Sequence, residues 1–204
     1  MSKSGYLVPG LYCLLIIAIF VCQHFMPELV FDWAILPDNP AYLKGIVTAV
    51  FIHANIEHLS SNILPFAICS FGLFYFYRDI ALKVTLIAHI VTGTLIWLLA
   101  RPVFHVGASG LIYALVLFIL ISAILKKNKK LIVFAFIVLS FQGGLVWGLV
   151  PQNTQISWES HLFGAITGII LAFIFRKQGP QADPEPNLDE EPLEDEDDYR
   201  HLSA

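Results

Sequence analysis

Six apolar runs, each close to the length that crosses a bilayer, constrain this chain more than any other feature of its sequence. A transmembrane helix needs roughly 20 predominantly apolar residues. The runs cover residues 7–26, 59–77, 81–100, 107–125, 131–150 and 159–175. They are continuously apolar, whereas the strands of a membrane barrel alternate polar and apolar residues. We therefore predict an all-α polytopic membrane protein, a bundle of six transmembrane helices.

The composition agrees with this prediction and separates the bundle from the end of the chain. Hydrophobic residues make up 57% of the 204 residues and charged residues only 14%, which excludes an ordinary soluble domain. From residue 178 onward the sequence instead carries ten acids and four prolines. Such a segment has too little apolar surface to fold by itself. We predict two parts, a membrane domain at 1–177 and an acidic disordered tail at 178–204.

The basic residues predict the orientation of the bundle. If the six runs alternate in direction, only Lys44 and Arg101 fall on one side of the membrane. The other basic residues of the bundle fall on the opposite side: Lys3, Arg78, Lys83, Lys126, Lys127, Lys129, Lys130, Arg176 and Lys177. Because basic loops stay in the cytoplasm, both termini are expected there. The acidic tail is then cytoplasmic.

A first polar cluster lies at the start of the second run, near the outer face of the membrane. His58 and Asn62 are four residues apart and so share one face of a helix. His53 comes five residues before His58 and is expected in the preceding loop. Polar groups inside a membrane are costly, so each is a functional candidate.

A second cluster opens the fourth run. Ser109 lies between Gly107 and Gly110, and Tyr113 follows one helical turn later on the same face as the serine. Small residues here favour the close approach of another helix.

The third cluster is in the sixth run, where His161, Gly164 and Gly168 have the spacing i, i+3 and i+7. They place a histidine above a smooth groove on one helix face. The groove would let two backbones come close enough for His161 to reach a neighbouring helix.

The three clusters are expected at one depth, and together they suit acyl transfer. A serine hydroxyl becomes a good nucleophile when a base removes its proton, and the pKa of histidine suits that task. We expect Ser109 to attack, with His161 as general base and then general acid. The oxyanion would be bound by the Ser109 backbone N–H, the Asn62 amide and the His58 imidazole.

A Ser-His dyad is expected rather than a triad, and no metal is expected. Glu159 is two residues before His161 and points about 160° away around a helix, so Tyr113, stacked on the imidazole, would orient His161 instead. A zinc protease motif requires His-Glu-x-x-His or His-x-x-Glu-His, whereas the chain has His-x-x-x-Glu-His at 53–58.

These clusters resemble the motifs of the bacterial, six-helix type of rhomboid intramembrane serine protease. The family pattern is His-x-x-x-Asn, matched at 58–62, then Gly-x-Ser-Gly, matched at 107–110, then a histidine with glycines at +3 and +7, matched at 161–168. Tyr113 and His53 add to a likeness that covers residues 5–177. The resemblance implies a serine endopeptidase of the bacterial inner membrane whose active site opens to the extracytoplasmic side.

The resemblance also implies the substrates and partners. It implies hydrolysis of a peptide bond in or near the transmembrane segment of a single-pass protein, within the lipid bilayer, through an acyl-enzyme. No cofactor and no nucleic acid are implied. Family members often carry a Trp-Arg pair in the first loop, and here Trp33 has no adjoining arginine. The alternative is a rhomboid-like protein that binds membrane helices without cutting them; such proteins typically lack the serine or the histidine, and this chain has both.

Several other residues have simpler expected roles. His89 is expected to be a hydrogen-bonded packing residue. Arg101 and His105 are expected either to shape the loop before Ser109 or to face water. The aromatic residues at the end of the second run are expected to face lipid or the membrane interface: Phe71, Phe74, Tyr75, Phe76 and Tyr77.

Overall fold

The computed structural model describes residues 6–141, 147–150 and 157–182, and in these ranges the chain is helical. The same ranges contain no strand, only an isolated antiparallel bridge between Ile35 and His105. The all-α prediction is therefore confirmed for the part of the chain that is described. Most of the predicted tail, residues 183–204, lies outside it.

Four helices are long and apolar enough to cross a membrane. They are α1 (Leu7–Phe25), α4 (Ile56–Phe76), α5 (Ala81–Leu99) and α6 (Ser109–Lys126), and their bounds agree with the first four predicted runs to within about three residues. Helix α8 (Trp158–Ile174) matches the sixth run to within one residue and has 17 residues, and α7 (Lys129–Phe141) begins near the start of the fifth run and is described as far as Phe141. The count of six spans therefore stays a prediction.

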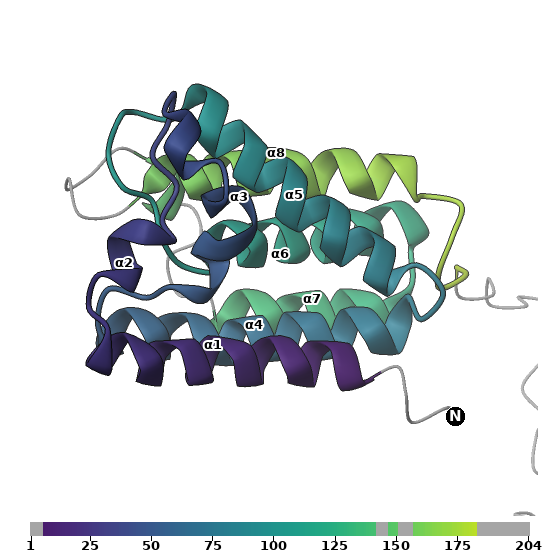
Figure 1. Cartoon of the computed structure of the whole chain (residues 1–204). Coiled ribbons are helices and arrows are strands. Elements are labelled where there is room, and N and C mark those ends of the chain that lie inside the picture. The colour runs from purple at the N-terminus through teal and green to yellow at the C-terminus, as the bar shows by residue number, and fades with distance from the viewer. Residues whose placement is uncertain (1–5, 142–146, 151–156, 183–204) are drawn as a thin grey trace, which may run out of the picture.

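Helix α6 lies in the middle of the bundle, with α5 and α8 on one side and α1, α4 and α7 on the other (Figure 1). It contacts α4, α5, α7 and α8. In the apolar window of α6, 61% of the residues are buried, compared with 17% for α1. The helix that begins with Ser109 is thus enclosed by its neighbours, whereas α1 presents most of its apolar surface outward.

Helices α6 and α8 cross with their backbones in contact. A Cβ atom on Gly164 would overlap the carbonyl group of Gly110, and one on Gly168 would overlap that of Ala114. The structure therefore has the close approach that the small residues of both helices predict. Any side chain at either α8 glycine would force the helices apart.

The segment between α1 and α4 packs on one end of the bundle as a series of short helical turns (Figure 1). These turns are α2 (Leu29–Asp32), η2 (Pro40–Tyr42), α3 (Gly45–Thr48) and η3 (Ala49–Phe51). The segment is joined to α1 by the Gln23 side chain, which donates to the carbonyl of His53 at 2.8 Å and accepts from its N–H at 3.2 Å. His53 lies in the loop between η3 and α4, as predicted.

The expectation for the aromatic residues of α4 is wrong for two of them. Phe71 and Tyr75 are exposed, but Phe74 and Tyr77 are buried in the core. Tyr77 packs edge to face on Phe118 of α6, with 5.0 Å between the ring centroids. The reason is that this end of α4 turns one side toward α6, a choice that an almost uniformly apolar helix does not reveal.

Candidate active site

The first two turns of α4 hold His58 and Asn62 near the end of the bundle where the short helical turns lie. The helix begins because the Asn55 side chain accepts from the backbone N–H of His58 at 2.8 Å, which is a typical N-cap. Asn62 is buried and its amide donates to the His58 carbonyl at 2.7 Å. The two side chains share a helix face as the spacing predicts.

Gly107 lies in the turn that precedes Ser109, and the His58 ring packs closely against it. Its φ of +108° lies in the left-handed region, which favours glycine. A Cβ there would also lie 2.6 Å from both Cε1 and Nε2 of His58. The N–H of Gly107 donates to Ala49 at 2.9 Å, which fixes the turn to the short helices. Gly107 therefore serves both the turn and the placement of His58.

Ser109 is the first residue of α6 and is half-buried. Its backbone N–H lies in the first turn, where the N–H groups of a helix have no partner within the helix and favour negative charge. Between residues that the structure describes, no hydrogen bond joins the Ser109 hydroxyl to His161.

His161 is held in the first turns of α8 by two contacts. Its Nδ1 lies 2.9 Å from the Gly148 carbonyl; because a carbonyl only accepts, Nδ1 carries the proton, and in the neutral ring Nε2 is then free to accept one. The ring stacks on Tyr113 with 4.2 Å between centroids and planes 4° apart. This is the stacking expected for Tyr113, whereas the Gly148 contact was not anticipated.

Gly148 itself has no room for a side chain. A Cβ would overlap the Tyr113 hydroxyl and lie 2.9 Å from Nδ1 of His161. The sequence signal for this role was one of three glycines near the end of the fifth run, which by itself does not distinguish a packing residue from a loop residue. Its partner became evident only when η4 (Trp147–Leu149) was seen beside α8.

The dyad candidates belong to neighbouring turns of two touching helices. Tyr113 follows Ser109 by four residues and so lies one turn along the same face of α6. Because Tyr113 stacks on His161, the imidazole lies within about one helical turn of the serine. The structure thus brings together His58, Asn62, Gly107, Ser109, Tyr113 and His161, and Gly110, Gly164 and Gly168 form the helix contact beneath them.

His53 adds a second imidazole beside His58. The ring is fully buried, and its two nitrogens have no hydrogen-bond partner in the structure. It meets the His58 ring edge to face with 5.0 Å between centroids. Burial, and then the proximity of His58, lowers the pKa of His53 to about 4. His53 is therefore neutral near pH 7, and it packs against the proposed oxyanion donor.

Five residues after the end of α5 and at the start of α8 form polar contacts that the sequence did not single out together. Arg101 and Glu159 pair at 2.8 Å between Nε and Oε1. His105 contacts the Ser157 hydroxyl at 2.6 Å, and Ser157 contacts the Ser160 hydroxyl at 2.5 Å. Of the two readings left open for Arg101 and His105, the structure supports the shaping of the loop. Burial lowers the pKa of His105.

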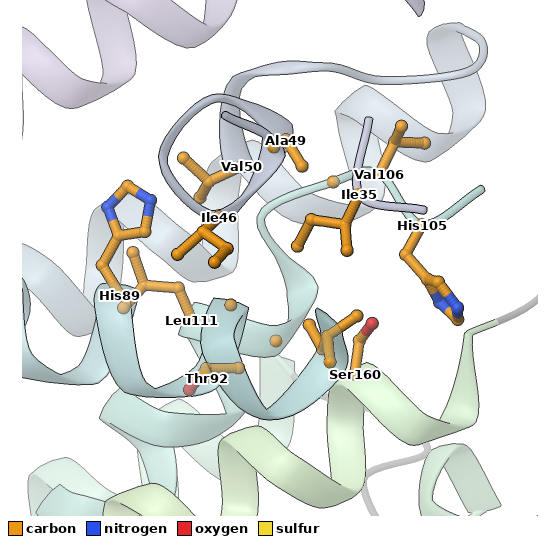
Figure 2. A pocket seen from close by; sticks show the side chains of 15 residues that line it. Ile35, Ile46, Ala49, Val50, His89, Thr92, His105, Val106, Leu111 and Ser160 are labelled. Carbon is orange, nitrogen blue, oxygen red and sulfur yellow. The ribbon is translucent and has the colours of Figure 1, made fainter. Parts of the chain in front are cut away.

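A small cavity lies next to these residues, lined on one side by the short helices and on the other by α5, α6 and α8 (Figure 2). Its volume is about 30 Å³, enough for a water molecule or two but not for a peptide. The lining includes Gly107 and Gly110 on either side of the nucleophile position, but not Ser109 or His161. A polypeptide substrate would therefore have to reach Ser109 by another route.

His89 lies beside the same cavity and is hydrogen-bonded as expected, to the Tyr12 hydroxyl and the Val47 carbonyl, each at 3.1 Å. Among the residues with described positions, no three His, Cys, Asp or Glu side chains come together in a group that could hold a metal ion.

Comparison with known proteins shows which family the sequence matches. The model of the Rhomboid domain matches residues 40–178. An uncharacterized protein of Mycobacterium tuberculosis is 31% identical over 141 residues, which cover 65% of this chain and 59% of the relative. A putative rhomboid protein of Acanthamoeba polyphaga mimivirus is 30% identical over 140 residues, 61% of this chain and 71% of that protein.

A more distant relative is the chloroplastic rhomboid-like protein 11 of Arabidopsis thaliana, 26% identical over 196 residues that cover 82% of this chain and 66% of the plant protein. The chain spans less than two thirds of the length of its mycobacterial relatives.

Proposed function

Because the chain belongs to the rhomboid family, we propose that it is an intramembrane serine endopeptidase. It hydrolyses a peptide bond in or near the transmembrane segment of a single-pass membrane protein and uses Ser109 and His161 as a catalytic dyad. In this proposal α7 and α8 complete a bundle of six spans. The basic loops and both termini are cytoplasmic, and the dyad faces the extracytoplasmic side of a bacterial inner membrane.

The chemical steps follow from the two side chains. His161 Nε2 takes the proton of the Ser109 hydroxyl while the oxygen attacks the substrate carbonyl. The tetrahedral intermediate collapses, the peptide C–N bond breaks, and the imidazolium gives its proton to the leaving amine. The ester on Ser109 is then hydrolysed by a water molecule that His161 deprotonates, which releases the new carboxyl terminus and restores the serine.

The oxyanion would be bound by donors from α4 and α6. The Ser109 N–H lies in the first turn of α6, where the helix favours negative charge. The Asn62 amide donates to the His58 carbonyl at 2.7 Å and makes a longer contact with the Ser61 hydroxyl at 3.4 Å, which it would exchange for the oxyanion. The His58 ring lies against Gly107, two residues from the nucleophile.

The observation that carries the proposal is the stacking of His161 on Tyr113 together with its bond to Gly148. These two contacts hold the imidazole next to the turn of α6 that carries Ser109, and they set the tautomer that a general base requires.

Membership of the rhomboid family supports the proposed substrate class. A helical peptide hydrogen-bonds its own carbonyls, so a transmembrane substrate must unwind before attack. Small residues before the cleaved bond and helix-destabilising residues after it would meet this requirement. Water must also reach Ser109 from the outer side.

The alternative is a non-cleaving rhomboid-like protein that binds membrane helices. One observation favours it: the Ser109–His161 hydrogen bond is not formed between these two described residues. Such a protein would use the same helix contacts but would not activate the serine.

Labelling with a fluorophosphonate separates the two functions. Purified protein in detergent is treated with the reagent, and the adduct is located by mass spectrometry in the wild type, Ser109→Ala and His161→Ala. The protease assignment requires an adduct on Ser109 that is lost in both variants while their melting temperatures are retained. A folded wild type that forms no adduct, and does not cleave single-span substrates, would favour the helix-binding function.

A further inference from the structure

A set of buried polar contacts joins the loop before α6 to the first turn of α8, and nothing in the proposed reaction uses it. We name these residues the outer clasp: Arg101, His105, Ser157, Glu159 and Ser160. The first two belong to the loop between α5 and α6, and the other three begin α8. Figure 2 shows the His105 imidazole beside the start of α8, close to Ser160.

The hydrogens of the clasp can be assigned from its acceptors. His105 Nε2 lies 3.0 Å from the Arg101 carbonyl, which only accepts, so Nε2 donates. In the neutral ring Nδ1 must then accept from the Ser157 hydroxyl. The Ser157 oxygen in turn accepts from the hydroxyl and the backbone N–H of Ser160. These hydrogen bonds run in one direction, from Ser160 through Ser157 and His105 to the Arg101 carbonyl.

The clasp residues are buried enough for these contacts to be selective. His105 is 2% exposed, Glu159 4% and Ser160 6%. Buried polar groups are costly without partners, so a displacement that broke the chain would leave several of them unpaired. Glu159 points away from His161 and toward Arg101, which is why it belongs to this set and not to the dyad.

The position of the clasp relates it to the dyad. His105 is four residues before Ser109, and Ser157 is four residues before His161. The backbone of His105 also pairs with Ile35 at 2.8 and 3.0 Å, so the loop has little freedom on its other side. Ser160 is the last residue in this series of hydrogen bonds, and its backbone packs on Gly110. A Cβ on Gly110 would lie 3.1 Å from the Ser160 carbonyl oxygen.

We propose that the outer clasp sets the distance and register between Ser109 and His161, and that His105 and Ser157 are its main positioning residues. They do not touch the substrate. They act by joining the segment before the nucleophile to the segment before the base, while the contact of Gly110 with Gly164 joins the same helices on the other side of the dyad. This inference rests on the proposed function.

The test uses three variants and one control variant of the full-length protein in detergent. Ser157→Ala removes the central hydroxyl, and Ser157→Thr keeps one. His105→Leu breaks the cross-link but leaves the Ser157 cap on Ser160. Ser140→Ala is the matched control, because Ser140 is exposed on α7 and bonds only within its own helix. A single-span substrate supplies kcat and KM, and hydrogen exchange of the 101–112 peptides reports the loop without any need for activity.

We expect kcat to fall about 10- to 100-fold in Ser157→Ala and His105→Leu, with KM within about twofold of the wild type, because misplacement of about 1 Å has such an effect. Ser157→Thr should recover most of the rate. Exchange in 101–112 should rise several-fold in the two damaging variants and stay unchanged in the control.

Wild-type kcat in Ser157→Ala and His105→Leu overturns the inference, and so does a loss of rate that follows the melting temperature and is not recovered by threonine. If the wild type itself neither cleaves nor reacts with fluorophosphonate, the proposed protease function fails. In that case the hydrogen-exchange data alone test whether the outer clasp holds the loop. Unchanged exchange in Ser157→Ala and His105→Leu then refutes the inference.

Discussion

The replacement of Gly164 by alanine tests whether the contact between α6 and α8 maintains the site. The new Cβ would overlap the Gly110 carbonyl oxygen and lie 2.9 Å from the carbonyl carbon, where ordinary Cβ contacts begin at 3.4 Å. The obstacle is backbone, so it cannot rotate away as a side chain could. The helices must therefore separate by at least about 0.5 Å at this point.

Two quantities should change. Overpacking of this kind typically costs about 1–3 kcal/mol, which for a chain of this size lowers the melting temperature by roughly 2–10 °C. Separation also moves His161, three residues before Gly164, away from Ser109, one residue before Gly110. We expect the rate of fluorophosphonate labelling at Ser109 to fall about 10- to 100-fold.

Gly10→Ala is the matched control. Gly10 lies inside α1, and a Cβ there meets nothing within 4 Å. It should leave both the melting temperature and the labelling rate close to those of the wild type, because alanine also favours the helix. Wild-type labelling and melting in Gly164→Ala would refute the reasoning, since the contact would then be loose enough to accept a methyl group.

Three further predictions concern the residues around the dyad. Asn62→Ala should lower kcat on the order of 10²–10³-fold while labelling at Ser109 remains detectable, because other oxyanion donors remain; a loss as complete as that of Ser109→Ala would make Asn62 structural. Tyr113→Phe should keep most of the activity because the ring still stacks on His161, whereas Tyr113→Ala should lose it, and equal kcat in the two would exclude the stacking role. Because the folded pKa of His53 is about 4 and the unfolded one about 6.5, the unfolded state binds more protons between these values. Stability should fall by about 1–2 kcal/mol from pH 6.5 to 5; His53→Gln should flatten this dependence, and an unchanged slope in unfolding curves would contradict it.

Much of the fold was predictable because the bilayer allows few solutions. Continuous apolar runs predicted helices, and the bounds of α1, α4, α5 and α6 followed to within about three residues. Helix α8 followed to within one residue, whereas the far end of the fifth run, predicted to reach residue 150, lies partly outside the described residues. The burial of Phe74 and Tyr77 also escaped prediction, because an almost uniformly apolar helix carries no mark of which side meets protein and which meets lipid.

The candidate site divides in the same way. Ser109, His161, His58 and Asn62 stand out in the sequence because a polar side chain in an apolar run needs a reason to be there. Gly148 and the outer clasp were not predicted. Gly148 contributes through its carbonyl, which every residue has, and the clasp residues lie in loops and helix ends where polar side chains are ordinary.

The sequence by itself determined that the protein has long apolar helices suited to a membrane, and which residue types are available for chemistry. Hydropathy and residue spacing can both be read from a single chain. Only the tertiary structure decided which residues are partners. The crossing of α6 and α8 at Gly110 and Gly164, the contact of Gly148 with His161 and the hydrogen bond between His105 and Ser157 each bring together atoms that local patterns did not pair. Such contacts are set by side-chain packing between helices, and local sequence patterns do not encode them.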